Sequence, residues 1–190
     1  MKKFDKINHE IDSLLTLKPR VFEDHRGQFI ETYQKRDFHQ LGIVDDFVQD
    51  NSAYSTFGVL RGLHFQHSGA EQSKLLRCVV GEIFDVAIDL REDSPTKGQW
   101  IGEILSEKNQ KIFYIPPGFA HGFLTLSEHS LVTYKLSNYY NSELEDAIHP
   151  MDPSLDIKWD KHIDVSQIIL STKDKNAKSY LDYLKGYYEN

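Results

Sequence analysis

A lysine stands on the apolar face of a predicted strand. Residues 73–80 are rich in β-forming residues, and side chains alternate between the two faces of a strand. Lys74 therefore shares a face with Leu76 and Cys78. It lies either at the mouth of a cavity, as a lysine that reaches toward water, or inside one, where its charge needs a partner. Lys74 is a candidate cation of a reactive site.

The next strand, residues 83–90, carries acidic side chains in the same manner. Asp85 and Asp89 share the face of Ala87, while larger apolar side chains occupy the other face. A strand that is covered on both faces and has ionisable groups among small residues predicts a barrel with a reactive interior.

Three more side chains complete a chemically meaningful set. His64 lies in a segment of alternating residues, His121 opens a strand after a Pro-Pro-Gly turn, and Tyr134 shares its face with Val132. Each has an ordinary structural explanation, a hydrogen-bonded histidine or a core aromatic. Taken together with Lys74, they supply a base, a cation and a phenolic acid.

Such a set suits proton abstraction next to a carbonyl group. Imidazole titrates close to neutral pH, so His64 could remove a carbon-bound proton. The Lys74 ammonium beside the carbonyl oxygen would stabilise the enolate as it forms. Tyr134 could return a proton to the opposite face of the carbon, which inverts that centre. This chemistry needs no redox cofactor.

Metal binding is the alternative chemistry for these residues. Jelly-roll proteins of the cupin class often hold a metal through His-x-His, a Glu and a later His. His64, Gln66, Glu71 and His121 follow that order, with glutamine in place of the second histidine. Glutamine is a poorer ligand for transition metals than imidazole, and a nearby lysine would repel a dication. The sequence therefore favours a site without a metal.

The elements that must position these groups are short strands. Between residues 47 and 136, segments of four to eight residues are separated by Gly, Pro, Ser or Asn, which is typical of a sandwich or barrel. We predict an all-β double-stranded β-helix, or jelly roll, with a few short peripheral helices, one of them over residues 35–41. Residues 1–18 look like a polar lead-in to a short strand around Leu14–Leu17. The chain, residues 1–190, is expected to form one domain, with residues 160–190 packing on the barrel as an extension.

Composition and charge reduce the number of function classes that fit this chain. A formal charge of −7 and a pI near 5.7 argue against a nucleic-acid surface, so an anionic ligand would need a local cluster of basic residues. The residues at the N-terminus lack the apolar run that a signal peptide needs, and no stretch approaches membrane-spanning length. Cys78 is the single cysteine, which fits a reducing compartment. We expect a cytoplasmic protein that binds neither membrane nor nucleic acid.

Several blocks of the sequence occur in the order of a known family. They are Phe47–Asn51, Leu60–Gln66, Gly81–Asp89, Ile115–Phe123 and Tyr134–Tyr140. Over residues 21–159 the chain resembles the dTDP-4-dehydrorhamnose 3,5-epimerases, which are also called dTDP-6-deoxy-D-xylo-4-hexulose 3,5-epimerases. The resemblance implies a cofactor-independent isomerase that inverts C3 and C5 of dTDP-4-dehydro-6-deoxy-D-glucose and yields dTDP-4-dehydro-L-rhamnose for polysaccharide biosynthesis.

The resemblance also implies a role for individual residues. His64 is the expected base, Tyr134 the acid and Lys74 the group that stabilises the enolate. Asp174, in a late Lys-Asp segment, is the expected partner of His64, with Asp85 as the substitute if Asp174 is too distant. The expected substrate contacts are Gln49, Asn51, Arg61 and Glu145 for the nucleotide, Tyr140 for stacking on thymine, His121 for the sugar, and Lys173.

Two further residues point to a second copy of the chain. Arg26 and Glu31 match family positions that reach into the neighbouring subunit's site, which implies a homodimer built by strand exchange. Arginine also suits a diphosphate, because its guanidinium binds phosphate with two parallel hydrogen bonds.

Other activities of the same fold stay open at this point. They are a mono-epimerase that inverts only C3 or only C5, an epimerase of CDP-sugars and a sugar 3,4-ketoisomerase. Tyr134 argues against the ketoisomerase. A metal-dependent cupin and a non-catalytic sugar-nucleotide-binding cupin are the alternatives from different classes.

Overall fold

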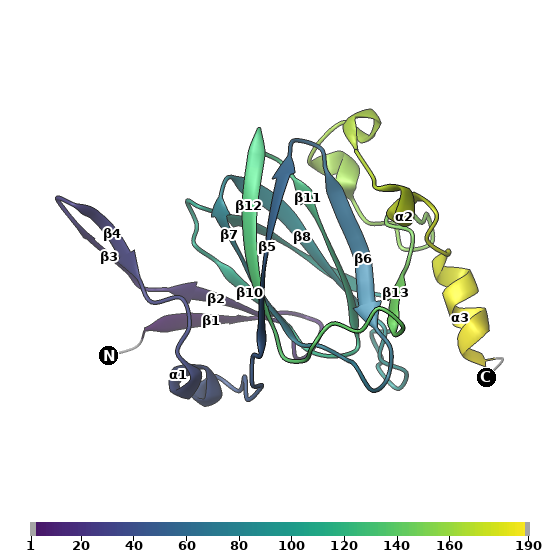
Figure 1. Ribbon diagram of the computed structural model, residues 1–190, viewed down its shortest axis with the longest axis horizontal. Coiled ribbons are helices and arrows are strands. Elements are labelled where there is room, and N and C mark those ends of the chain that lie inside the picture. Colours follow the sequence, from purple (N-terminus) through teal and green to yellow (C-terminus); the bar gives the residue numbers. More distant parts are fainter. Residues whose placement is uncertain (1–2, 189–190) are drawn as a thin grey trace.

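Two antiparallel sheets stand face to face and make up the body of the molecule (Figure 1). The computed structural model describes residues 3–188. The six-stranded sheet has the order β1 (Phe4–Asn8), β2 (Leu15–Pro19), β10 (Ile112–Ile115), β7 (Lys74–Val80), β12 (His129–Leu136) and β5 (Gln49–Thr56). The five-stranded sheet has the order β13 (Glu145–Ala147), β6 (Leu60–Gln66), β11 (Phe119–Thr125), β8 (Glu82–Asp89) and β9 (Trp100–Ser106). The predicted all-β jelly roll is confirmed.

The space between the sheets holds the face on which the sequence placed Lys74. Leu76 and Cys78 of β7 pack there against Ala87 of β8 and Val132 of β12, all of them buried. Alternation along each strand then directs Lys74 and Asp85 to the same interior. Ionisable groups therefore enter the space between the sheets among apolar neighbours.

A glycine allows β6 and β11 to approach closely. Gly62 has a φ of +119°, and a Cβ at this position would lie 2.5 Å from the Cα of Gly122. The register of the two strands pairs His64 with His121. The close approach thus brings two histidines from distant parts of the sequence next to each other.

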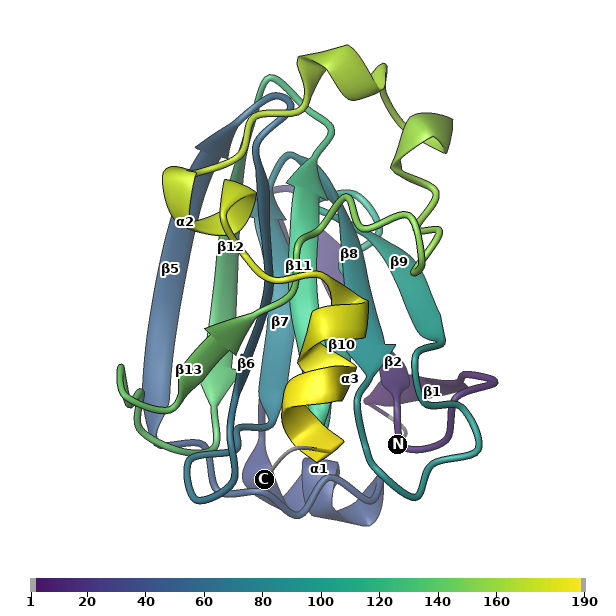
Figure 2. The same cartoon turned by 90° about the vertical axis from the view of Figure 1, so that its right-hand side faces the viewer.

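The C-terminal part of the chain covers the outer face of the five-stranded sheet (Figure 2). Trp159 of the 3-10 helix η1 (Trp159–Lys161) packs against Phe84, and Tyr183 of α3 (Tyr180–Tyr188) packs against Phe65. Two more short helices, η2 (Val165–Gln167) and α2 (Thr172–Lys175), lie between them in sequence. The tail ends in the helix α3, which lies on this face of the sheet.

The N-terminal part differs from the predicted polar lead-in. β1 pairs with β2, and its single buried side chain is Phe4, which contacts Phe38 of α1 (Lys35–Gln40). The predicted short helix is confirmed. β3 (Val21–Asp24) and β4 (Gly27–Ile30) form a hairpin that projects from the body of the molecule (Figure 1). In the described part of the chain no helix is long and apolar enough to cross a membrane.

Candidate active site

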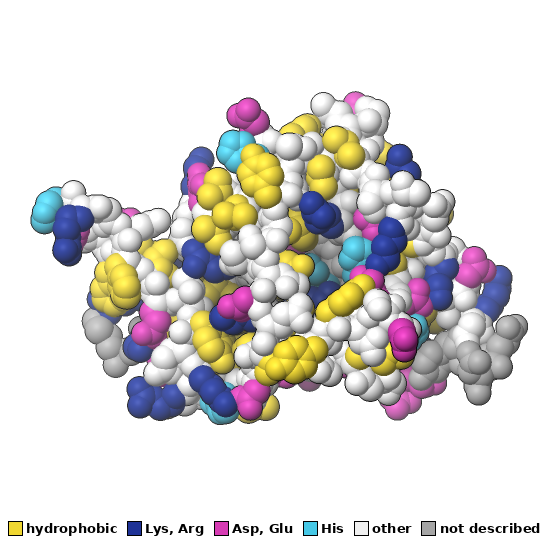
Figure 3. Space-filling view, viewed as in Figure 1, with side chains coloured by type: hydrophobic (Ala, Val, Ile, Leu, Met, Phe, Trp, Pro, Cys, Tyr) yellow, Lys and Arg dark blue, Asp and Glu magenta, His cyan; other side chains and the backbone are white. Residues whose placement is uncertain are grey.

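A cavity of about 430 Å³ opens between β5, β6, β7, β11 and β12 and is bordered by the segment that leads into α2. In the space-filling view, basic side chains surround a hollow in which histidine is visible (Figure 3). The cavity brings together seven of the predicted site residues: Arg61, His64, Lys74, His121, Tyr134, Lys173 and Asp174. Its remaining wall includes apolar groups from Leu60, Phe123, Ile169 and Leu170.

His64 is held by a carboxylate from far along the chain. Its Nε2 lies 2.7 Å from Oδ1 of Asp174. Because the carboxylate accepts, Nε2 donates, and Nδ1 keeps the lone pair. Burial by itself would raise the pKa of Asp174, but hydrogen bonds from His64 and Ser171 lower it below its usual value, so the carboxylate stays charged. An imidazole oriented by an aspartate in this way can act as a general base.

Ser171 fixes the position of Asp174. Its hydroxyl donates to Oδ2 of Asp174 at 2.8 Å and accepts from the Asp174 amide at 3.0 Å, so it caps the start of α2. Both oxygens of the Asp174 carboxylate are therefore engaged, one by Ser171 and one by His64. Ser171 was not among the predicted site residues, although a serine three residues before an acidic residue is a helix-capping signal.

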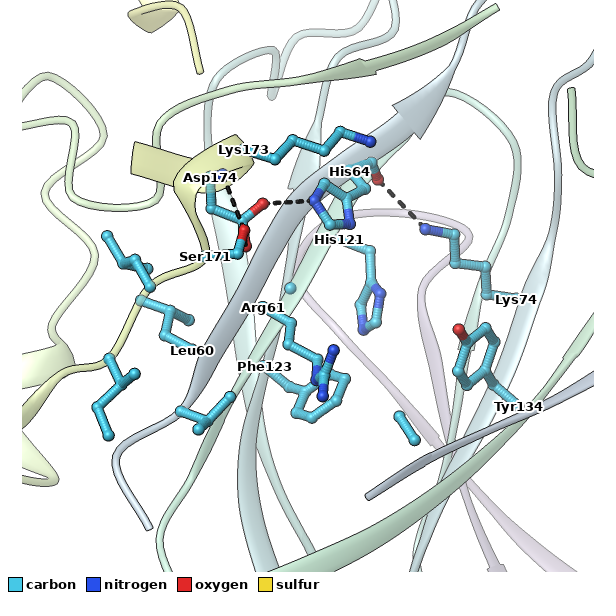
Figure 4. Close-up of a pocket in the computed structure, with 15 residues that line it drawn as sticks. Leu60, Arg61, His64, Lys74, His121, Phe123, Tyr134, Ser171, Lys173 and Asp174 are labelled. Carbon is cyan, nitrogen blue, oxygen red and sulfur yellow. Dashed lines mark hydrogen bonds and ion pairs between the residues drawn. The ribbon is translucent and has the colours of Figure 1, made fainter. Parts of the chain in front are cut away.

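Lys74 lies deep in the cavity, on the same interior face as Tyr134 (Figure 4). Its ammonium donates to the backbone carbonyl of His64 at 3.2 Å. Burial lowers the pKa of Lys74 to about 8, while the negative charges of Asp85 and Glu145 oppose that shift. The side chain is therefore a cation near neutral pH that is poorly solvated, and such a cation stabilises a developing oxyanion effectively.

Tyr134 lies across the cavity from the pair formed by His64 and Asp174 (Figure 4). It stands on β12, which pairs with β7 on one side and with β5 on the other. A planar intermediate between His64 and Tyr134 would present one face to each. This arrangement allows a proton to leave one face of a carbon and another to arrive at the opposite face.

His121 forms a second histidine–aspartate pair in the interior. Its Nε2 lies 3.0 Å from both oxygens of Asp85. Both side chains are buried, and burial is the main cause that lowers the pKa of His121. Asp85 is thus the partner of His121, and the orienting carboxylate of His64 is Asp174.

The remaining predicted nucleotide contacts form a connected rim outside the cavity. The hydroxyl of Tyr140 donates to Glu145 at 2.7 Å, and the ammonium of Lys173 also contacts that carboxylate. The amide of Tyr140 donates to Gln49, whose side chain donates to Asn51 at 3.0 Å. Hydrogen bonds therefore join five residues from distant segments into one edge beside the cavity.

Arg61 is positioned by the neighbouring strand β5. Its Nε donates to the hydroxyl of Ser55 at 3.0 Å, and its Nη2 donates to the backbone carbonyl of Tyr54 at 3.1 Å. The guanidinium thereby reaches the cavity as part of its wall. Ser55 is a further positioning residue that the sequence did not indicate, because the contact depends on how the chain turns from β5 in one sheet to β6 in the other.

Arg26 and Glu31 are not brought to this cavity. Arg26 lies at the turn of the projecting hairpin, where it pairs with Asp24 and is 79 % exposed. Glu31 pairs with Lys3 at 2.7 Å. Within one chain, these two predicted substrate contacts lie apart from the other predicted site residues.

The residues of the predicted metal alternative do not gather in a ligand set. Among residues 3–188, no group of three or more His, Cys, Asp or Glu side chains is arranged to hold a metal ion. Glu71 instead accepts a hydrogen bond from the backbone of Gly69. The two histidines of that set are each paired with an aspartate, as described above.

Comparison with known proteins places this arrangement in a family. A sequence model of the family described as dTDP-4-dehydrorhamnose 3,5-epimerase matches residues 8–182. The chain is 45% identical over 178 residues to the protein of that name from Methanothermobacter thermautotrophicus, covering 94% of this chain and 95% of the relative. It is 49% identical over 154 residues to the one from Salmonella typhimurium, covering 80% and 84%.

Solved structures of such proteins have the same fold. The epimerase from Elizabethkingia anophelis superposes with a TM-score of 0.90 at 43% identity, covering 95% of this chain and 98% of that one. A dTDP-6-deoxy-D-glucose-3,5-epimerase from Legionella pneumophila, solved in complex with dTDP-4-keto-L-rhamnose, gives 0.88 at 47% identity, covering 93% and 92%. The chain belongs to the dTDP-4-dehydrorhamnose 3,5-epimerase family.

Proposed function

We propose that the protein inverts C3 and C5 of dTDP-4-dehydro-6-deoxy-D-glucose to give dTDP-4-dehydro-L-rhamnose. The observation that carries this proposal is the placement of the His64–Asp174 pair and Tyr134 on opposite sides of one cavity that also holds Lys74. The names of its relatives and the sugar nucleotide bound to the Legionella pneumophila enzyme support the same substrate. The product would serve deoxysugar supply for polysaccharides.

The proposed reaction at each carbon has two proton transfers. Nδ1 of His64 takes the proton from the carbon next to the C4 carbonyl, and the electrons of the broken bond move into the carbonyl to form an enolate. The Lys74 ammonium stabilises the negative oxygen. Tyr134 then delivers a proton to the opposite face of the carbon as the carbonyl re-forms, and solvent returns both residues to their starting states. No electrons leave the substrate, so the overall change is an isomerisation.

The basic residues around the cavity would hold the diphosphate of the substrate. Arg61 and Lys173 contribute positive charge at the cavity, whereas the chain as a whole carries a formal charge of −7. Gln49, Asn51 and Glu145 would bind the nucleotide, with Tyr140 stacking on thymine. Tyr140 is exposed and joined to the rim by its hydroxyl, which suits a stacking platform.

The site would be completed by a second copy of the chain. The outer face of the six-stranded sheet leaves Tyr54 61 % exposed, and the projecting hairpin exposes Phe22 and Phe29. Large exposed apolar side chains on an extension and on an open sheet are typical of a protein–protein interface. In a homodimer with exchanged hairpins, Arg26 and Glu31 would reach the partner's cavity.

Mixed dimers test this arrangement directly. Arg26→Ala and His64→Ala should each have little activity alone. After the two proteins are unfolded and refolded together, about half of the dimers are mixed, and one of their two sites has both native residues. We expect about a quarter of the wild-type activity. A mixture no more active than its components would show that Arg26 does not serve the partner's site.

The pH dependence of turnover tests the role of Lys74. Because its pKa is lowered to about 8 and the protonated form is the one that stabilises the enolate, kcat should fall as pH rises above about 8. The measurement is kcat between pH 6 and 10, with each sample returned to pH 7 to exclude irreversible inactivation. A kcat that stays constant through pH 10 would contradict this role.

Product analysis distinguishes the proposed activity from those of related proteins. The protein is incubated separately with the dTDP-linked and the CDP-linked 4-keto-6-deoxy sugar, and the ring configuration of the product is determined by NMR. We expect inversion at both carbons with the dTDP-linked sugar. Inversion at one carbon identifies a mono-epimerase, and a ketone moved to C3 identifies a ketoisomerase.

We propose a cytoplasmic location because the cysteine of this chain is a free thiol. Cys78 is a free thiol that is buried among apolar side chains, and burial raises its pKa to about 12. An unpaired cysteine is ordinary in a reducing compartment.

A further inference from the structure

Asp85 is a buried carboxylate that takes no part in the proton transfers of the proposed reaction. It is 0 % exposed, and it stands on β8 among the apolar residues between the two sheets. Its two oxygens both lie 3.0 Å from Nε2 of His121. A buried carboxylate with a neutral partner keeps an uncompensated charge, which is costly unless a cation lies nearby.

Lys74 is a cation in the same interior that could balance this negative charge. Its only described hydrogen bond is to the backbone carbonyl of His64, and it forms no direct ion pair with a described carboxylate. Asp85 lies close to it through a short series of contacts: Lys74 bonds the backbone of His64, His64 lies opposite His121, and His121 bonds Asp85. The negative charges of Asp85 and Glu145 both act against the lowering of the Lys74 pKa by burial. Glu145 is already engaged by Lys173 and Tyr140 at the rim, so Asp85 is the anion left to balance the buried lysine.

His121 lies beside both groups. Because Asp85 accepts from Nε2, the other ring nitrogen, Nδ1, carries the lone pair of the neutral ring. No described residue bonds Nδ1, and the ring forms part of the cavity wall. Nδ1 is therefore placed to accept a hydrogen bond from a hydroxyl group of the substrate.

We propose that Asp85 is a positioning residue of the reaction, which keeps Lys74 protonated at the enolate oxygen and holds His121 with Nδ1 as an acceptor toward the sugar. This inference rests on the proposed function. One carboxylate thus sets the charge of one substrate-facing group and the tautomer of another, without touching the substrate itself.

The charge state of Lys74 depends on the titratable and charged groups that line the cavity with it or act on its charge. They are Arg61 and His64 on β6, Asp85 on β8, His121 on β11, Tyr134 on β12, Glu145 on β13, and Lys173 and Asp174 on α2. Asp174 is committed to His64 and Ser171. The neighbouring strand β10 presents Ile115 opposite Lys74 and adds no charge. Removal of the Asp85 charge therefore leaves the lysine without its main compensation.

The test is Asp85→Asn, which keeps the shape of the side chain and removes its charge. The pKa of Lys74 should fall by about one unit or more, because a nearby opposite charge favours the charged form of an ionisable group. The descending limb of kcat against pH should move to lower pH by the same amount. The titration is followed by ¹⁵N NMR of the Lys74 amine in the free protein, so it does not depend on turnover.

A matched control is available on the same strand. Asp89 is also 0 % exposed and shares the interior face, but it bonds to Arg91, Ser94 and Thr96 outside the cavity. Asp89→Asn should lower thermal stability and leave both the lysine titration and the pH limb unchanged. An equal shift in both variants would overturn the proposal, because the effect would then be a general consequence of disturbing β8.

The outcomes separate this proposal from the function on which it rests. An unchanged Lys74 titration in Asp85→Asn overturns the role of Asp85, whatever the turnover. If wild-type protein fails to convert the sugar nucleotide, the proposed function fails, while the titration still reports on the charge pair. If Asp85→Asn does not fold, ¹⁵N NMR of the wild-type His121 ring decides: the Nε2–H tautomer supports the proposal and the Nδ1–H tautomer overturns it.

Discussion

His64→Ala should lower kcat about 10³- to 10⁴-fold and slow hydrogen exchange at both carbons of the substrate to the same extent. Removal of a general base typically costs 10²- to 10⁴-fold, and the upper part of that range is expected because the same imidazole is assigned to both carbons. The measurement is turnover of dTDP-4-dehydro-6-deoxy-D-glucose at saturating substrate. The Michaelis constant should change little, since the imidazole acts mainly in the transition state.

His67→Ala is the matched control. His67 lies just beyond the end of β6 and pairs with Asp146 at 2.9 Å, outside the cavity. Its replacement should leave kcat unchanged. If His64→Ala retained wild-type exchange at either carbon, His64 would not be the base for that carbon.

Tyr134→Phe should uncouple proton removal from inversion. The phenylalanine ring fills the same space but has no proton to donate, so His64 can still remove the proton and return it to the same face. We expect deuterium exchange from solvent to persist and the rate of inversion to fall about 10²- to 10⁴-fold. Both rates can be followed in one NMR time course in deuterated water.

A second tyrosine variant separates this loss from general damage. Tyr183→Phe changes a buried tyrosine that packs on the outer face of the five-stranded sheet, away from the cavity. It should preserve the ratio of inversion to exchange. If Tyr134→Phe also preserved that ratio, another group would have to be the acid.

The face of a strand on which each side chain lies could be predicted from the sequence, because alternation depends only on neighbouring residues. The interior position of Lys74 follows from its parity with Leu76, and that of Asp85 from its parity with Ala87. The partner of Asp85 was not readable in the same way. It depends on the register of β8 against β11, which places Ala87 opposite His121, and register is a property of two segments.

The contact between His64 and Asp174 spans 110 residues of sequence. No periodicity links two such positions, so only the family resemblance led to Asp174. The hydrophobic pattern also failed to predict β1. In this strand one buried residue, Phe4, precedes four that are not buried, so buried and exposed side chains do not alternate. Its pairing with β2 stabilises it instead. The rim joining Tyr140 to Gln49 is likewise a product of the fold.

The proposed reaction requires the residues of this cavity to remove protons from the two carbons that flank one carbonyl. The most direct test is NMR of dTDP-4-dehydro-6-deoxy-D-glucose incubated with the wild-type protein in deuterated water. We expect deuterium at both C3 and C5 and conversion of the sugar to dTDP-4-dehydro-L-rhamnose. Absence of deuterium at either carbon, with the ring configuration unchanged, would contradict it.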